Sequence, residues 1–313
     1  MTTDAFLFAG QGAQYVGMGA EAAEAFPEVA AALTEADEAL GEPLSRVIAA
    51  GPEEALTLTH NAQPAILALG VGHLRLALGL GLSPRVLLGH SLGEYAAWVA
   101  AGSLSFEDAV RLVRRRGQFM QEAVPVGVGA MSAIISAPTE VVERLCAEVS
   151  APGRLVAVAV YNCPGNVVVS GHVEGVEALE RAVEEGRHGM PRRLAVSAPF
   201  HCELLAPAAK RLAEALAETE VRPNTLPVIA NVTAEVVEPG ASPEAIRELL
   251  VRQVQAPVRW EASLRRMLAL GVERALTFGP GTMIQSQLKR VKRRMPMVSL
   301  DRLSDIREKL QQE

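Results

Sequence analysis

The feature that most constrains this chain is a short apolar segment that runs into two closely spaced glycines and then into a helix. Residues 85–88 (RVLL) predict a buried strand, residues 89–93 (GHSLG) a tight turn, and residues 94–101 an alanine-rich helix. In a nucleophile elbow, a Gly-x-Ser-x-Gly turn between strand and helix exposes the serine hydroxyl at the end of a sheet. The segment therefore predicts an α/β protein whose nucleophile is Ser91.

The rest of the chain predicts an α/β body with a hydrolase-like parallel sheet, interrupted by a smaller α+β insertion. Further body strands are expected at 5–9, 228–231 and 274–278, and body helices at 20–40, 105–123, 204–218, 243–254 and 260–270. Between Pro125 and Pro199 the order becomes β-α-β-β-α-β, as in a ferredoxin-like fold. Its strands are expected at 130–136, 155–161, 167–170 and 193–197. We therefore expect a catalytic body of residues 1–125 and 200–313 and a ferredoxin-like subdomain of residues 126–199.

Composition argues against several classes of protein. The formal net charge is −6 and no stripe of Lys and Arg with interleaved aromatics occurs, so nucleic acid is not an expected partner. The longest apolar run, residues 65–82, contains His73 and Arg75, which indicates a buried helix and not a membrane span. Three widely spaced cysteines support neither a disulfide framework nor a metal site. With no secretory pattern at the start, we expect a cytoplasmic protein.

A serine nucleophile needs a general base, and the six histidines of the chain are the candidates. Four of them fall in predicted helices or surface turns and are interpreted as structural: His60, His73, His172 and His188. His90 adjoins the nucleophile on the same turn, and we expect it to support the site by packing or hydrogen bonding. His201 lies where the chain returns from the insertion to the body, where a cleft is expected. We therefore predict that His201 is the base.

Two further parts of a serine site are less obvious in the sequence. No acidic residue between Ser91 and His201 stands out as a third triad member, so a carbonyl oxygen would hold the Nδ1 proton and leave a Ser-His dyad. The turn at residues 10–14 (GQGAQ) lacks the third glycine of a dinucleotide fingerprint, because Tyr15 stands there. Such a turn can instead bring the backbone N–H of Gln11 beside Ser91 as an oxyanion donor.

Six sequence blocks occur in order along nearly the whole chain. They are GQGAQ at 10–14, GHSLGEY at 89–95, RGQFMQEA at 116–123, PFH at 199–201, RQVQAPVRW at 252–260 and GPG at 279–281. With these blocks the chain resembles the malonyl-CoA:acyl carrier protein transacylase family. The resemblance implies that Ser91 is acylated, that His201 is its base, and that the backbone N–H groups of Gln11 and Leu92 form the oxyanion hole. It also implies that the backbone carbonyl of Gln253 orients His201.

Arg116 is the last of three adjacent arginines, a pattern that more often forms a solvated face. Only one of three successive helical residues can face a cleft. A guanidinium matches a carboxylate with two parallel charge-assisted hydrogen bonds, so it can favour malonyl over acetyl by about 2–4 kcal/mol. The resemblance assigns this role to Arg116 and adds Phe200, His90 and Asn162 as substrate-binding candidates. Related acyltransferases that accept methylmalonyl often have serine directly before the histidine, so with Phe200 at that position the resemblance favours malonyl.

The resemblance implies a ping-pong transfer of malonyl from malonyl-CoA to the phosphopantetheine thiol of acyl carrier protein, for fatty-acid synthesis. The coenzyme A thioester is then a substrate, and no permanently bound cofactor and no metal are expected. Three alternatives remain: a serine hydrolase or thioesterase, a malonyl transferase of a polyketide pathway, and a non-catalytic module that docks the carrier protein.

An acidic carrier protein has to dock on a local basic patch, because this chain is itself net negative. The candidates are Arg192 and Arg193 in the insertion and Lys289, Arg290, Lys292, Arg293 and Arg294 near the C-terminus. The second group has a simpler interpretation as a solvated helix face. We expect the enzyme to be a monomer.

Overall fold

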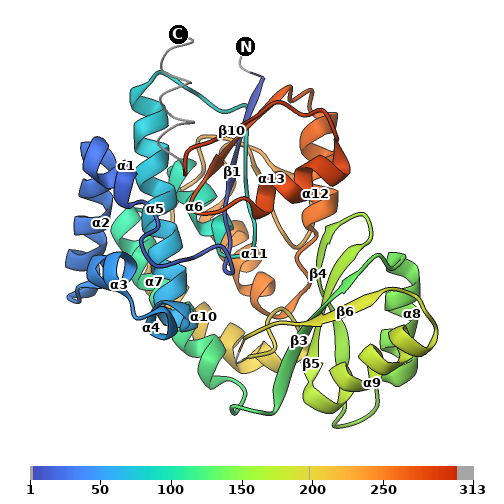
Figure 1. The fold of residues 1–313 in the computed structure, drawn as a ribbon. Helices are drawn as coiled ribbons and strands as arrows, with labels where there is room; N and C mark the ends of the chain where they lie inside the picture. Colours follow the sequence, from blue (N-terminus) through green and yellow to red (C-terminus); the bar gives the residue numbers. More distant parts are fainter. Residues whose placement is uncertain (1–2, 197, 302–313) are drawn as a thin grey trace.

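The computed structural model describes residues 3–196 and 198–301, which form two sheets and the helices around them (Figure 1). The two ends of the expected body, residues 1–2 and 302–313, and residue 197 of the predicted strand 193–197 lie outside the described residues. The architecture is the predicted α/β class, a mainly parallel sheet with a small antiparallel sheet beside it. The division into a body of residues 1–125 and 200–313 and a subdomain of residues 126–199 stays a prediction.

The larger sheet has the strand order β10-β9-β1-β2-β7-β8. Its strands are β1 (Asp4–Phe8), β2 (Val86–Gly89), β7 (Val228–Ile229), β8 (Val236–Val237), β9 (Arg274–Phe278) and β10 (Met297–Ser299). All neighbouring pairs are parallel except β7 and β8. Every residue of β1 and β2 is buried, because helices cover both faces of the sheet. This is why residues 5–8 and 86–89 form continuous runs without charged or polar side chains.

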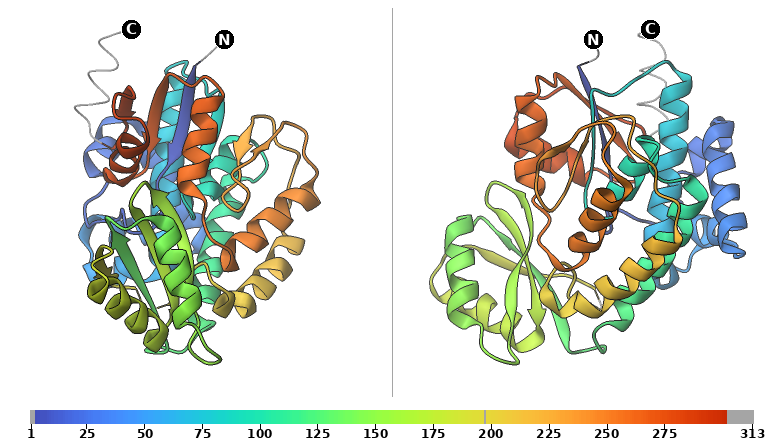
Figure 2. Two further views of the ribbon diagram at one scale, coloured as in Figure 1. Left: turned by 90° about the vertical axis from the view of Figure 1, so that its right-hand side faces the viewer. Right: turned by 180° about the vertical axis from the view of Figure 1, so that it is seen from behind.

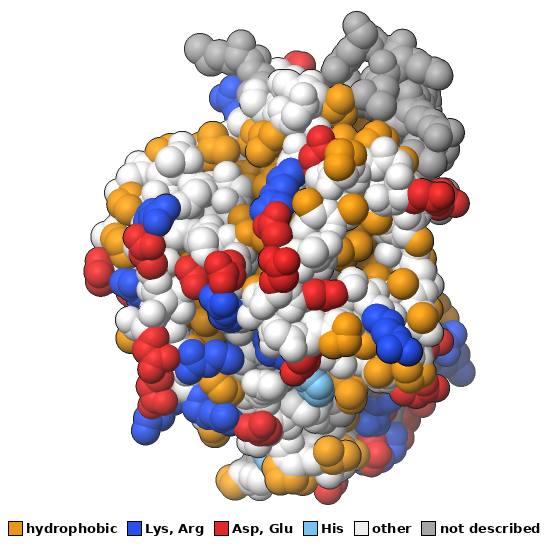
Figure 3. Space-filling view, turned by 90° about the vertical axis from the view of Figure 1, so that its left-hand side faces the viewer, with side chains coloured by type: hydrophobic (Ala, Val, Ile, Leu, Met, Phe, Trp, Pro, Cys, Tyr) orange, Lys and Arg blue, Asp and Glu red, His pale blue; other side chains and the backbone are white. Residues whose placement is uncertain are grey.

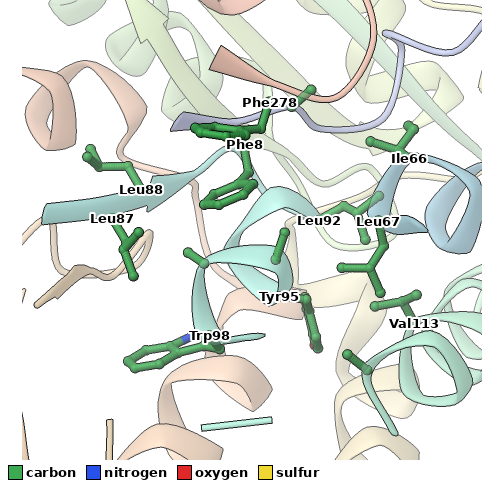
Figure 4. Packing of buried hydrophobic residues seen from close by; sticks show 14 of the residues in the cluster. Phe8, Ile66, Leu67, Leu87, Leu88, Leu92, Tyr95, Trp98, Val113 and Phe278 are labelled. Atoms are coloured by element: carbon green, nitrogen blue, oxygen red, sulfur yellow. The ribbon is translucent and has the colours of Figure 1, made fainter. Parts of the chain in front are cut away.

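Helices pack on this sheet and on one another. Those that precede the smaller sheet are α1 (Ala20–Ala25), α2 (Pro27–Leu40), α3 (Leu44–Ala50), α4 (Glu53–Thr57), α5 (Thr59–Gly79), α6 (Gly93–Ala100) and α7 (Phe106–Glu122). Those that follow it are η1 (Glu203–Leu205), α10 (Ala206–Glu218), α11 (Pro243–Gln255), α12 (Trp260–Ala269) and α13 (Met283–Val291). In Figure 4, Leu87 of β2 points toward Trp98 of α6, Leu88 points to the opposite face of the sheet, and Phe8 of β1 lies beside Phe278 of β9.

The smaller sheet has the order β4-β5-β3-β6 and is antiparallel throughout. Its elements follow the predicted β-α-β-β-α-β order: β3 (Gly129–Ile135), α8 (Thr139–Val149), β4 (Val156–Cys163), β5 (Asn166–His172), α9 (Val173–Glu185) and β6 (Met190–Arg193). One face packs on α8 and α9 through Ile134, Val158 and Val169. The order of strands and helices is that of a ferredoxin-like fold.

Two predicted elements are wrong in their bounds. The single helix expected at 20–40 is two helices, because Phe26 is extended and Pro27 begins α2. The last strand of the smaller sheet is Met190–Arg193 and not 193–197, since its register is set by pairing with β3, where Met190 lies opposite Ile135. β6 is an exposed edge strand, so the apolar alternation that marks the other strands is missing from its sequence.

The small sheet lies at the end of the larger sheet where β1 and β2 finish (Figures 1 and 2). The two parts share backbone hydrogen bonds between Val258 and β4, from Tyr161 N to Val258 O and from Val258 N to Ala159 O, both 2.9 Å long. The apolar run at 65–82 belongs largely to α5, which is buried along most of its length. In the described part of the chain, no helix is long and apolar enough to cross a membrane.

Candidate active site

The predicted strand-turn-helix unit is formed by β2, residues 90–92 and α6, and the backbone of Ser91 is left-handed, with φ 51°. Such a conformation is costly for a residue other than glycine and marks a turn that its surroundings enforce. A Cβ atom at Gly89 would overlap the backbone of Gly93, and one at Gly93 would overlap the carbonyl oxygen of Phe8. Both glycines are therefore required by close backbone contacts.

Ser91 and His201 are hydrogen-bonded although 110 residues separate them: Oγ of Ser91 lies 2.7 Å from Nε2 of His201. The other ring nitrogen, Nδ1, lies 2.7 Å from the backbone oxygen of Gln253. A carbonyl can only accept, so Nδ1 carries the proton and Nε2 is left to accept from the serine hydroxyl. The third partner, for which the sequence supplies no acid, is a backbone carbonyl.

His201 is 4% exposed, and its backbone is also left-handed, with φ 59°. Burial and, to a smaller extent, the positive charge of Arg116 together lower the pKa of its imidazole to about 3, against an opposite effect of the hydrogen bond to the Gln253 carbonyl. The imidazole is therefore neutral at physiological pH, which is the state that can take a proton from Ser91.

Of the three adjacent arginines on α7, only Arg116 faces Ser91. Its Nη2 lies 3.4 Å from Ser91 Oγ and donates to Oε1 of Gln253 at 2.9 Å, while Nη1 donates to Oε1 of Gln63 at 2.7 Å. The residue is 2% exposed, and no carboxylate among the described residues forms an ion pair with it. Burial lowers the pKa of this guanidinium. A buried cation held by neutral oxygens is a site prepared for an anion.

The other two arginines point away from the site. Arg114 pairs with Glu42 at 2.9 Å, and Arg115 pairs with Glu218 at 3.1 Å.

A cavity of about 760 Å³ opens above Ser91 between the two sheets. Body residues that line it include Gln11, His90, Arg116, Phe200 and His201, and residues of the small sheet that line it include Met131, Ala133, Val160, Asn162 and Val168. The backbone N–H groups of Gln11 and Leu92 have no acceptor within the described chain. Unpartnered N–H groups next to a serine nucleophile are what an oxyanion hole requires.

Asn162 links the two sheets. Its Oδ1 lies 3.0 Å from Nε2 of His90 and accepts from Nε2 of Gln287 at 3.0 Å, and its amide nitrogen donates to Asn166 at 3.1 Å. The ring of His90 also meets Trp260 edge-on, with 5.3 Å between ring centroids. His90 is thus held by packing and hydrogen bonding, the supporting arrangement expected from the sequence.

The sequence reasoning missed three buried polar side chains at the site. Asn231 accepts from the Ser91 backbone N–H at 2.8 Å and donates to the Gly89 carbonyl at 2.7 Å. Glu94 accepts from Nε2 of Gln253 at 2.7 Å, and Gln63 accepts from Arg116. Two of them carried a signal, since Asn231 ends a predicted strand and Glu94 is a lone acid in an alanine-rich helix.

Metal ligation has little support in the geometry. Among residues 3–196 and 198–301, no group of three or more His, Cys, Asp or Glu side chains is placed to hold a metal ion. The three cysteines are buried and unpaired.

The fold and the site together define an α/β protein with a hydrogen-bonded serine-histidine pair beside a buried guanidinium that forms no ion pair with the described residues. The acyl transferase domain model matches residues 5–296, and the chain belongs to this family. It is 45% identical over 302 residues to the malonyl CoA-acyl carrier protein transacylase of Bacillus subtilis, covering 96% of this chain and 94% of that protein.

Two solved structures show that the similarity extends to the fold. The crystal structure of the malonyl-CoA:acyl carrier protein transacylase from Xanthomonas oryzae pv. oryzae superposes with a TM-score of 0.95, at 40% identity, covering 100% of this chain and 99% of that one. A malonyl-transacylase in complex with a type II polyketide synthase acyl carrier protein gives a TM-score of 0.94 at 40% identity, covering 99% of each chain. The family resemblance inferred from the sequence blocks is confirmed.

Proposed function

We propose that this enzyme transfers the malonyl group from malonyl-CoA to the phosphopantetheine thiol of acyl carrier protein, supplying the extender unit for fatty-acid synthesis. The observation that carries the proposal is the Arg116 guanidinium, which is buried, free of any carboxylate in the described chain, and 3.4 Å from Ser91 Oγ. An acyl group bound to Ser91 and ending in a carboxylate places its charge where this cation can bind it. Malonyl is such a group, whereas acetyl is not.

In the first half-reaction Nε2 of His201 takes the proton of Ser91 Oγ as the oxygen attacks the thioester carbonyl. The tetrahedral oxyanion accepts from the N–H groups of Gln11 and Leu92. When it collapses, the C–S bond breaks and the coenzyme A sulfur leaves with the proton held on Nε2. In the second half, Nε2 takes the carrier thiol proton, the sulfur attacks the malonyl ester, and Ser91 regains its proton as the C–O bond breaks.

Arg116 also links the substrate to the base. Its charge is the second cause of the low pKa of His201. A malonyl carboxylate on the guanidinium offsets that charge and raises the basicity of His201 when the correct acyl group is bound. A serine hydrolase needs the same Ser-His pair but has no use for a buried cation beside it, so Arg116 favours the transferase over that alternative.

Phe200 and Asn162 line the same cavity and are proposed to contact the acyl group and the pantetheine arm. Coenzyme A enters as part of a substrate. Cytoplasmic location and a monomeric state stay predictions.

For the carrier protein we propose docking on the C-terminal basic group, residues Lys289, Arg290, Lys292, Arg293 and Arg294. All five are exposed and form no ion pair with the described residues, and Arg290 lines the cavity. Of the two candidates in the insertion, Arg193 is paired with Glu180 at 2.6 Å, which leaves Arg192 as a single exposed cation there. On the face that carries α1, α2 and α3, acidic and basic side chains are interspersed (Figure 3). Raised ionic strength should increase KM for the carrier protein far more than KM for malonyl-CoA.

Intact mass spectrometry with malonyl-CoA tests the function. Wild-type enzyme should gain one malonyl group within seconds, Ser91→Ala should gain none, and holo carrier protein should remove the group from the wild type. Release of free malonate at the same rate without carrier protein would identify a hydrolase. Absence of any adduct would identify a docking module.

A further inference from the structure

Glu94 is a buried carboxyl group for which the mechanism above has no task. It lies on α6, three residues after the nucleophile, and its side chain has no exposed surface. Its Oε2 accepts from Nε2 of Gln253 at 2.7 Å and from the backbone N–H of Asn231 at 3.2 Å. Burying a carboxyl group is costly unless hydrogen bonds replace its contacts with water.

The amide of Gln253 lies between Glu94 and Arg116 and can satisfy both in only one orientation. Its Nε2 donates to Glu94 and, at 2.9 Å, to the backbone oxygen of Ser91, and its Oε1 accepts from Nη2 of Arg116 at 2.9 Å. If the Gln253 amide were flipped, its NH₂ group would face the Arg116 guanidinium, which is also a donor. Its oxygen would face two other acceptors, Oε2 of Glu94 and the backbone oxygen of Ser91. By accepting from Nε2 of Gln253, Glu94 therefore keeps Oε1 of the same amide directed at Arg116, and this oxygen holds the guanidinium in place.

We infer that Glu94 is a positioning residue for acyl selectivity: as a hydrogen-bond acceptor, and not as a charge, it holds the Gln253 amide so that Arg116 is directed at the acyl carboxylate. This inference rests on the proposed malonyl transfer. It assigns the side chain of Gln253 a separate task from its backbone carbonyl, which holds His201.

The protonation of Glu94 agrees with an acceptor role. Burial raises the pKa of this carboxyl group to about 7, against the lowering effects of the hydrogen bonds from Gln253 and Asn231. A substantial fraction is therefore neutral at pH 7. A proton placed on Oε1 leaves Oε2 free to accept from both donors.

The test measures acylation of Ser91 by malonyl-CoA and by acetyl-CoA in Glu94→Gln and Glu94→Met. Glutamine keeps an oxygen at the position of Oε2, and we expect the malonyl-to-acetyl ratio of kcat/KM to stay within about threefold of wild type. Methionine has a similar shape but no acceptor oxygen. In Glu94→Met the malonyl-to-acetyl ratio should fall by about tenfold or more, because kcat/KM for malonyl-CoA falls while kcat/KM for acetyl-CoA stays unchanged. Equal loss for both substrates in Glu94→Met would reduce Glu94 to a structural residue, and loss of selectivity in Glu94→Gln would show that charge matters; either result overturns the inference.

Gln253→Met supplies a second route if Glu94→Met does not fold. It keeps the backbone carbonyl that holds His201 and removes only the amide, so it should show the same loss of selectivity, and the double variant should lose little more. Equal loss of malonyl and acetyl transfer in Gln253→Met, or additive losses in the double variant, would also overturn the inference. Wild-type enzyme that fails to form a malonyl adduct would instead refute the proposed function itself.

Discussion

The two sheets contribute to the site in different ways. The body holds Ser91, His201 and Arg116 through short hydrogen bonds that run from β2 to α7 and α11. The small sheet contributes a mostly apolar wall, and its polar link to the elbow is Asn162. Reacting atoms need sub-ångström placement, which one hydrogen-bonded body provides, whereas a wall only has to exclude water and fit the substrate.

The difference follows from the architecture of each sheet. Parallel strands buried on both faces end at one edge, so segments far apart in the chain deliver polar groups to one place. In the antiparallel sheet residues alternate between faces: Ile134 and Val169 pack on α8 and α9, whereas Met131 and Val168 face the cavity. Substitutions in the body should therefore impair chemistry, and substitutions in the small sheet should impair binding.

The largest effect is expected for His201→Ala. Without the base, formation of acyl-Ser91 should slow by about 10³-fold or more, with malonyl and acetyl affected alike. Rapid-quench mass spectrometry of the acyl-enzyme measures the rate, and Cys202→Ala next to it serves as the control. A loss of less than about tenfold would mean that the 2.7 Å Ser91–His201 bond is not the catalytic contact.

Asn231→Leu should have the next largest effect. The change leaves the Ser91 N–H and the Gly89 carbonyl without a partner, which costs about 2–4 kcal/mol of the free energy of unfolding. The elbow loses its clamp, so acylation by both thioesters should slow by about 10- to 100-fold. Chemical denaturation and acylation kinetics measure the two quantities. A change confined to KM would assign Asn231 to binding and would break the contrast between the sheets.

Asn162→Ala, in the small sheet, should act on binding. The variant removes the acceptor shared by His90 and Gln287, and KM for malonyl-CoA should rise by about three- to tenfold while kcat changes by less than about twofold. Steady-state kinetics separates the two parameters. A fall in kcat as large as that of Asn231→Leu would show that the small sheet takes part in positioning the reacting atoms.

The smallest effect concerns pH and a body histidine away from the site. Burial lowers the pKa of His73 to about 3, from 6.5. The unfolded chain therefore binds the proton more tightly, and the stabilisation that is present above pH 6.5 is lost as pH falls toward 3. Between pH 7.5 and 5.5 this group should remove roughly 1 kcal/mol from the free energy of unfolding. His73→Asn should lose correspondingly less over that range by urea denaturation, whereas an unchanged pH dependence would contradict the prediction.

Local patterns predicted much of the fold. β1 and β9 are mainly apolar segments bounded by turns, and the elbow follows from two glycines that close backbone contacts require. The bounds of the edge strand β6 and the presence of the short strands β8 and β10 could not be found in this way. They have few residues, and their pairing partners decide where they begin and end.

The polar groups of the site also fall into those that local sequence patterns predicted and those that they did not. Asn231 lies 140 residues from Ser91 in the chain, and the contact between them depends on β7 pairing with β2. No local pattern records such a contact, because it depends on the register of strands and on which helix face is buried.

The sequence by itself identified the family and the elbow turn and predicted Ser91 as the nucleophile, because a Gly-x-Ser-x-Gly turn between strand and helix is the pattern of a nucleophile elbow. Only the tertiary structure decided which of three arginines meets Ser91 and that Glu94 and Asn231 belong to the site. The physical reason is range: steric exclusion acts between neighbours in the chain, whereas hydrogen bonds in a buried site join residues that only packing brings together.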